Sequence, residues 1–218
     1  MEEKTPSTFH RFVDEPLFMW SRWVLAAMVI PLAFSFTMPL WRISMEAPQY
    51  PKGLYLDIYA YTVKGGDDGQ HLQEINTLNH YIGMHTIDRA ALSDLDWLPF
   101  AFGALALLAL RVALVGNVRS LIDLVIITTY VAGFGMFRFY YKMYVFGHEL
   151  DPKAPVKVAP FMPALLGSKQ IANFTTHAGP QAGTYLVTLF ATTATALMLW
   201  HLYVGHRNAR RLKAGTAA

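Results

Sequence analysis

Four long apolar runs constrain the fold of this chain more than any other feature of its sequence. They cover residues 23–41, 98–115, 121–146 and 183–204. A helix needs about 20 residues to cross the hydrocarbon core of a bilayer, and each run is close to or above that length. The chain is also 54% hydrophobic and only 15% charged, which is too apolar for an average soluble domain. We therefore predict an α-helical membrane protein with four transmembrane helices.

The polar parts of the chain divide around these runs. They are the N-terminal segment 1–22, the turn 116–120, the basic tail 205–218 and two long segments, 42–97 and 147–182. Within the first long segment, residues 41–45 and 54–61 alternate or are rich in β-forming side chains, which indicates strands. Residues 70–78 have the character of a short helix. We expect a small extracytoplasmic β-containing domain between the first and second transmembrane helices, and a loop over 147–182.

The distribution of lysine and arginine predicts the orientation. Four spans place both termini and the turn 116–120 on one side, where the basic residues are Lys4, Arg11, Arg22, Arg119, Arg207, Arg210, Arg211 and Lys213. The two long segments contain fewer lysines and arginines per residue. The positive-inside rule then predicts a protein of the bacterial inner membrane, with both termini in the cytoplasm and both long segments in the periplasm. The run 23–41 lacks a small-residue cleavage site, so we interpret it as a retained helix.

Composition excludes several classes of function. The chain has no cysteine, so a disulfide, a zinc–thiolate site and an iron–sulfur cluster are excluded within it. The net charge is only +3 and the basic residues gather at the C-terminus, which argues against a nucleic-acid-binding protein. No segment resembles a nucleotide-binding loop or a catalytic carboxylate pair. We expect a protein that is not an enzyme.

Two short polar stretches carry potential metal ligands. The stretch 79–85 contains two histidines and a methionine, and the stretch 147–152 contains His148 and Asp151. A thioether is a soft ligand and imidazole accepts either oxidation state of copper, so this combination favours copper. Taken singly, each stretch also has a structural explanation, in which its histidine is hydrogen-bonded and Met84 fills a small core. Their common side of the membrane favours a shared site.

We predict that His80, Met84 and His148 bind the metal, and that His177, on the same side of the membrane, is a further metal-site residue. Asp151 or Asn173 would orient an imidazole from behind. Weaker candidate ligands are Met45, His71, His85 and Met162.

These stretches belong to a longer set of motifs. In order along the chain, the motifs are APQYPKGL at 47–54, LNHYIGM at 78–84, GHELDPKAP at 147–155 and LGSKQIANF at 166–174. The set resembles a poorly characterised family of bacterial membrane proteins encoded near nitrous-oxide reductase and copper-handling genes. The resemblance implies an accessory role in copper delivery to a respiratory copper enzyme or in its assembly. The sequence departs from the expected pattern at 162–164, where Met-Pro-Ala stands in place of a proline pair after an aromatic residue.

Three hypotheses follow for the function. The first is a membrane-anchored, extracytoplasmic copper-binding accessory protein that passes copper to a respiratory copper enzyme. The second is a non-catalytic structural subunit of a larger respiratory or photosynthetic membrane complex. The third is a copper-dependent membrane oxidoreductase, for which the sequence offers no substrate site.

Overall fold

The computed structural model describes residues 15–171 and 174–215. Within these residues the chain divides into two compact units. The helical unit comprises residues 15–33, 102–131 and 187–215, and the sheet unit comprises Phe34–Ala101 and Ala132–Leu186. The candidate ligands of the sequence analysis fall in the sheet unit, except for Asn173, which lies outside the described residues.

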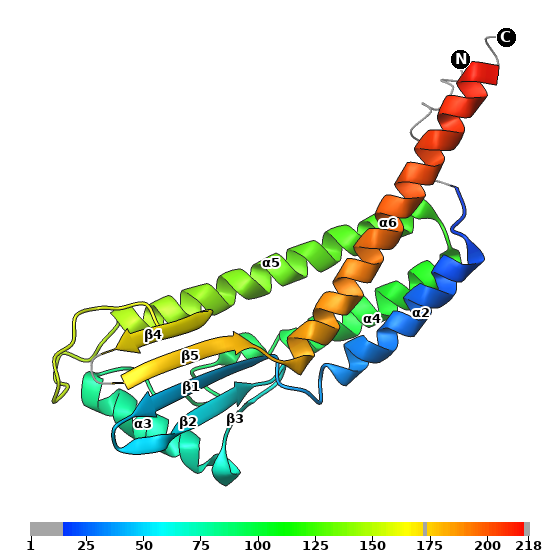
Figure 1. Cartoon of the computed structure of the whole chain (residues 1–218). Coiled ribbons are helices and arrows are strands. Elements are labelled where there is room, and N and C mark those ends of the chain that lie inside the picture. Colours follow the sequence, from blue (N-terminus) through cyan, green and yellow to red (C-terminus); the bar gives the residue numbers. More distant parts are fainter. Residues whose placement is uncertain (1–14, 172–173, 216–218) are drawn as a thin grey trace, which may run out of the picture. The chain divides into compact units, whose positions relative to one another are not determined.

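Three of the helices are long and apolar enough to cross a membrane. They are α4 (Leu98–Val115), α5 (Val118–His148) and the part Ala182–Arg207 of α6 (Ala182–Gly215) (Figure 1). Large apolar side chains such as Leu107, Leu114 and Leu199 are exposed on them. Exposed apolar surface of this kind is characteristic of helices surrounded by lipid. These helices are consistent with a membrane protein.

The prediction of four transmembrane helices with a small inserted domain is wrong. The first apolar helix, α2 (Met19–Phe34), has 16 residues and is shorter than the other three. The extramembrane part is a five-stranded antiparallel sheet, and two of its strands come from the segment 147–182, where we expected a loop. The physical reason is pairing. A strand between the first two helices leaves an open edge of backbone donors and acceptors, and a strand from the later segment satisfies that edge.

The strand order of the sheet is β3-β2-β1-β5-β4 (Figure 1). The strands are β1 (Trp41–Ala47), β2 (Tyr50–Ile58), β3 (Val63–Gly65), β4 (Gly167–Ile171) and β5 (Phe174–Pro180). The central strand β1 is antiparallel to both of its neighbours, β2 and β5. The sheet therefore joins the two long polar segments of the sequence into one structure.

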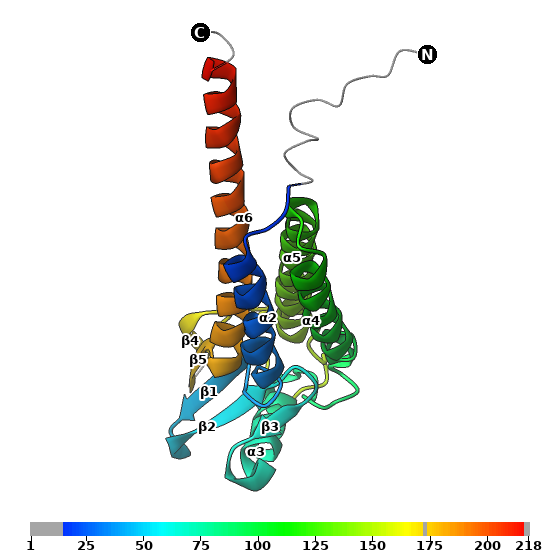
Figure 2. The ribbon, with the colours of Figure 1, turned by 90° about the vertical axis from the view of Figure 1, so that its right-hand side faces the viewer.

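The two faces of the sheet differ in character. On the inner face, Leu54 and Leu56 of β2 pack with Ile75 of α3 (Gln70–Ile82), the helix that lies against the β2–β3 side of the sheet (Figure 2). The end of α5 also covers this face, since the rings of Trp41 and Phe139 lie 5.4 Å apart. This apolar layer is the core of the sheet unit.

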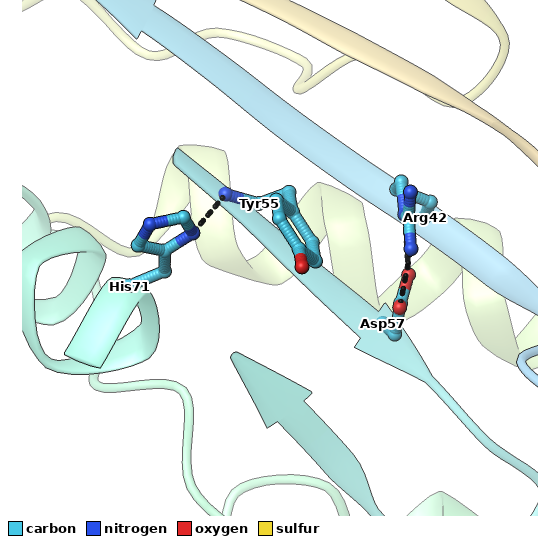
Figure 3. A network of polar contacts seen from close by, with 4 residues as sticks. All are labelled: Arg42, Tyr55, Asp57 and His71. Carbon is cyan, nitrogen blue, oxygen red and sulfur yellow. Dashed lines mark hydrogen bonds and ion pairs between the residues drawn. The ribbon is translucent and has the colours of Figure 1, made fainter. Parts of the chain in front are cut away.

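The outer face carries polar side chains from the alternate positions. The guanidinium of Arg42 donates two hydrogen bonds of 2.7 Å to the carboxylate of Asp57 and lies 4.4 Å from the ring centroid of Tyr55 (Figure 3). The backbone amide of Tyr55 donates to Nδ1 of His71 at 3.3 Å. The hydrogen bond to Asp57 raises the pKa of Arg42, so this arginine stays charged at any ordinary pH.

The helical unit is closed by contacts between its N-terminal segment and the α4–α5 turn. The amide of Leu17 donates to the carbonyl of Gly116 at 2.6 Å. The side chain of Arg22 donates to the carbonyls of Ala113 and Leu114, also at 2.6 Å. These carbonyls belong to the last turn of α4 and have no partner within the helix, so Arg22 acts as a cap.

Candidate functional site

The two stretches that carry the candidate ligands meet in the sheet unit. The amide of Asp151 donates to the carbonyl of Gly83 at 2.8 Å, and the amide of Val156 donates to the carbonyl of Tyr81 at 3.0 Å. Gly83 has φ +79°, and a Cβ built there would lie 2.8 Å from the Asp151 nitrogen. The close approach of the two backbones therefore requires glycine at this position.

Local structure explains how Met84 reaches this junction. The helix α3 buries Ile75, Asn79 and Ile82, which recur at helical spacing on one face. Gly83 ends the helix in the left-handed conformation, and the amide of Met84 donates to the carbonyl of Asn79 at 2.8 Å. This helix ending, typical of glycine, turns the chain so that Met84 lies beside the buried face of α3.

A cavity of about 60 Å³ lies beneath the inner face of the sheet. Its wall comes from the sheet, from α3 and the turn after it, from the end of α5 and from the segment before β4. The lining residues are Ile43, Met45, Leu56, Ile75, Asn79, Met84, Ile87, Met143, Phe146, Phe161, Pro163, Ala164, Phe174 and Thr176. The wall is almost entirely apolar, and it includes residues beside both histidine-containing stretches. We call this space the methionine cavity, because three methionines line it.

Each of the three methionines comes from a different element. Met45 belongs to β1 and Met143 to α5, and both are buried, whereas Met84 is half-buried in the turn after α3. Asn79 contributes the most polar side chain of the wall. Asn79 is only 3% exposed and its Nδ2 has no hydrogen-bond partner. A buried amide nitrogen without an acceptor costs free energy, so this side chain is an unsatisfied polar group in an apolar wall.

The predicted histidine ligands lie in other surroundings. His80 follows buried Asn79 along α3 but is itself exposed. The ring of His148 stacks on Tyr144 with centroids 3.8 Å apart, and its Nδ1 donates to the Tyr144 carbonyl at 2.9 Å. This arrangement fixes the orientation of the ring. Neither histidine lines the methionine cavity.

Asp151 has a structural role at the junction. Its Oδ1 accepts a hydrogen bond of 2.8 Å from the amide of Lys153, and its carbonyl accepts one of 3.1 Å from the amide of Ala154. The side chain thereby holds the turn that follows α5, as short polar side chains do in many turns. Asp151 positions the backbone that touches Gly83.

His177 lies on the opposite face of the sheet from the cavity. It pairs with Ser44 in the register of β5 and β1, whereas its neighbour Thr176 pairs with Met45, which lines the cavity. Directly opposite residues share a face and successive residues alternate. On the outer face a hydrogen bond of 2.6 Å joins Nδ1 of His177 to the hydroxyl of Ser168. Nε2 of His177 lies 4.0 Å from Oε1 of Glu46. The sheet therefore separates His177 from Met84.

Among the weaker candidates only Met45 lines the cavity. His85 approaches Glu149, with 3.8 Å between Nε2 and Oε2, which adds an exposed contact between the two stretches. Met143 and Asn79 were not predicted as site residues.

Within residues 15–171 and 174–215, no three histidine, aspartate or glutamate side chains are grouped so as to hold a metal ion. Any site in the cavity must therefore use thioethers and neutral oxygen or nitrogen.

A scan against protein-family models finds no match for the chain, and neither does a search of the curated proteins.

Proposed function

We propose that this protein is a membrane-anchored copper-binding accessory protein that passes copper to a respiratory copper enzyme. The observation that carries the proposal is the meeting of two stretches remote in the sequence, joined through Gly83 and Asp151, beside a cavity lined by Met84. Gly83 allows the two stretches to meet, and the thioether of Met84 at the cavity wall is a ligand suited to a soft metal. The resemblance to membrane proteins encoded beside copper-handling genes supports the same assignment.

Transfer by ligand exchange would be the chemical work of such a protein. Thioether ligands favour Cu(I) and bind it without protons to release, so the ion can leave when a partner offers stronger ligands. No bond of a substrate is broken. The protein is therefore an accessory factor in this proposal and not an enzyme.

The sheet unit is assigned to the periplasmic side of a bacterial inner membrane. Arg119 lies beside the α4–α5 turn and Arg207 near the end of α6, and both favour the cytoplasmic side under the positive-inside rule. The N-terminal segment is bonded to the same turn through Leu17 and Gly116. If α5 and α6 each cross the bilayer, the strands between them face the periplasm, where copper enzymes of respiration acquire their metal.

Copper retention by the purified full chain tests the proposal. Metal-free protein in detergent is equilibrated with copper under reducing and under oxidising conditions, passed through a desalting column and analysed for metal. We expect about one copper per chain in the reducing experiment. Retention of no copper under either condition overturns the proposal. Copper-free protein that co-purifies in fixed ratio with a large membrane complex would overturn it in favour of a structural subunit.

A further inference from the structure

We propose that the ion is held as Cu(I) by the thioethers of Met45, Met84 and Met143, inside the methionine cavity. This inference rests on the proposed function and names the ligands and the oxidation state of the metal. It replaces the imidazoles of His80 and His148 by two methionines that the fold brings beside Met84.

Position is the first argument. The three methionines come from β1, from the turn after α3 and from α5, and all three line one cavity of about 60 Å³. A methionine side chain has three rotatable bonds, so sulfur atoms from three sides can converge with little change of backbone. A thioether needs no neighbouring carboxylate or proton acceptor to act as a ligand. The site can therefore form inside an apolar wall.

The charge of the ion is the second argument. Among residues 15–171 and 174–215, those that line the cavity include no Asp, Glu, Lys, Arg or His, so the ligands are neutral and the ion keeps its full charge. The cost of transferring an ion from water into an apolar medium rises with the square of its charge, so a divalent ion is penalised far more than Cu(I). Soft thioethers also prefer Cu(I) to the harder divalent ions. The wall thus selects monovalent copper over Zn²⁺ and Cu²⁺.

The unpartnered amide of Asn79 is the third argument. Its Nδ2 is buried without a hydrogen bond, although Asn79 lines the cavity. A half-turn about the terminal torsion exchanges nitrogen and oxygen in an amide, whose two ends are assigned from their surroundings. With Oδ1 turned inward, Asn79 gives a bound ion one neutral oxygen contact.

Volume-conserving substitutions test the ligand set. Leucine is close to methionine in size, so Met45→Leu, Met84→Leu and Met143→Leu should preserve the fold. Cu(I) affinity is measured under anaerobic conditions by competition with a coloured Cu(I) chelator, on the full chain in detergent. We expect each single variant to bind at least about tenfold more weakly and the triple variant to retain no copper. Met136→Leu is the matched control, because Met136 is an exposed methionine of α5 outside the cavity wall.

Two further measurements do not depend on these variants. Copper-edge X-ray absorption on selenomethionine-labelled protein should show copper–selenium scattering, with the fold untouched. Affinity should be the same at pH 5.5 and pH 7.5, because thioethers do not titrate. A site built from imidazoles would weaken over this interval, since the pKa of histidine is about 6.5.

Each result separates this inference from the proposed function. If the triple leucine variant binds copper as the wild type does, while His80→Ala/His148→Ala does not, the thioether site is wrong and the copper function stands. If copper–selenium scattering is absent from copper-loaded protein, the thioether site is likewise wrong. If the wild-type chain binds no copper, both fall.

Discussion

The carbonyl of Gly83 accepts a hydrogen bond of 2.8 Å from the amide of Asp151, and the glycine carries a φ of +79°. Gly83→Ala would place a Cβ 2.8 Å from the Asp151 nitrogen and 2.9 Å from its carbonyl oxygen. We expect the variant to lose about 2–4 kcal/mol of stability, from left-handed strain and from separation of the two backbones. Copper retention should fall with it, although no ligand has been removed. Thermal unfolding and metal analysis of the purified variant measure both effects.

Gly69→Ala is the matched control for that prediction. Gly69 has φ +94°, but a Cβ there would meet nothing within 4 Å. It should lose only the strain contribution, about 1 kcal/mol, and retain copper. Equal losses of stability and of copper at both glycines would show that the contact with Asp151 has no special role.

The ion pair on the outer face should stabilise the sheet more than an exposed pair does. Asp57 is 8% exposed and accepts both hydrogen bonds from Arg42. We expect Asp57→Asn to cost about 1–3 kcal/mol, because it leaves the arginine with one good acceptor fewer. Arg89 and Asp96 form a pair with both side chains largely exposed, so Arg89→Gln should cost at most about 1 kcal/mol. Chemical unfolding of the two variants compares them, and a reversed order would contradict the expectation.

Tyr50 should make the stability of the sheet unit depend on pH in the alkaline range. Its hydroxyl donates a hydrogen bond to Glu74, and this bond raises the pKa of Tyr50 above its ordinary value. A raised pKa means that folding favours the neutral phenol. Its contribution is therefore complete below the unfolded pKa of about 10 and is lost as pH rises through the higher folded value. The unfolding midpoints of wild type and Tyr50→Phe should differ by a constant amount from pH 7 to 9 and converge above pH 10. A constant difference at pH 11 would argue against this hydrogen bond.

Arg22 should stabilise the helical unit through its cap on α4. Its two hydrogen bonds to the carbonyls of Ala113 and Leu114 are charge-assisted, and the side chain is partly exposed. We expect Arg22→Gln to lose about 1–2 kcal/mol and Arg22→Lys to lose less, since lysine keeps the charge but not the fork. Arg111 is an exposed residue of α4, so Arg111→Gln removes a charge without removing the cap and should change the unfolding midpoint in detergent very little. Equal effects at both arginines would indicate net charge as the cause.

Much of the fold could be predicted from the local sequence. Apolar length identified the cores of α4, α5 and α6, and alternation identified β1 and most of β2. The strands β4 and β5 were not predicted, because their stability depends on a partner remote in the chain. β5 pairs with β1, and β4 pairs with β5. The helix α3 runs four residues further than expected, to Ile82, because Gly83 rather than the polar character of the stretch ends it.

The candidate site could be predicted from the sequence only in part. Met84 stood out because a thioether beside histidines in a polar stretch is unusual. Met143 did not, because nothing local distinguishes a methionine of α5 that faces a cavity from one that is exposed, such as Met136. Which face of that helix turns inward depends on the sheet packed against it. The face of the sheet on which His177 lies could not be read from the sequence for a similar reason, since the register of β5 with β1 decides it.

The place of β1 between β2 and β5 has a consequence for biogenesis. During synthesis β1 and β2 emerge early, but β5 leaves the ribosome only after α4 and α5 have been made. Until then one edge of β1 has no backbone partner and the apolar face of the sheet lacks part of its cover. A nascent chain stalled after α5 is thus a substrate for proteases and for edge-to-edge aggregation, and quality control at the membrane has a defined interval in which to act.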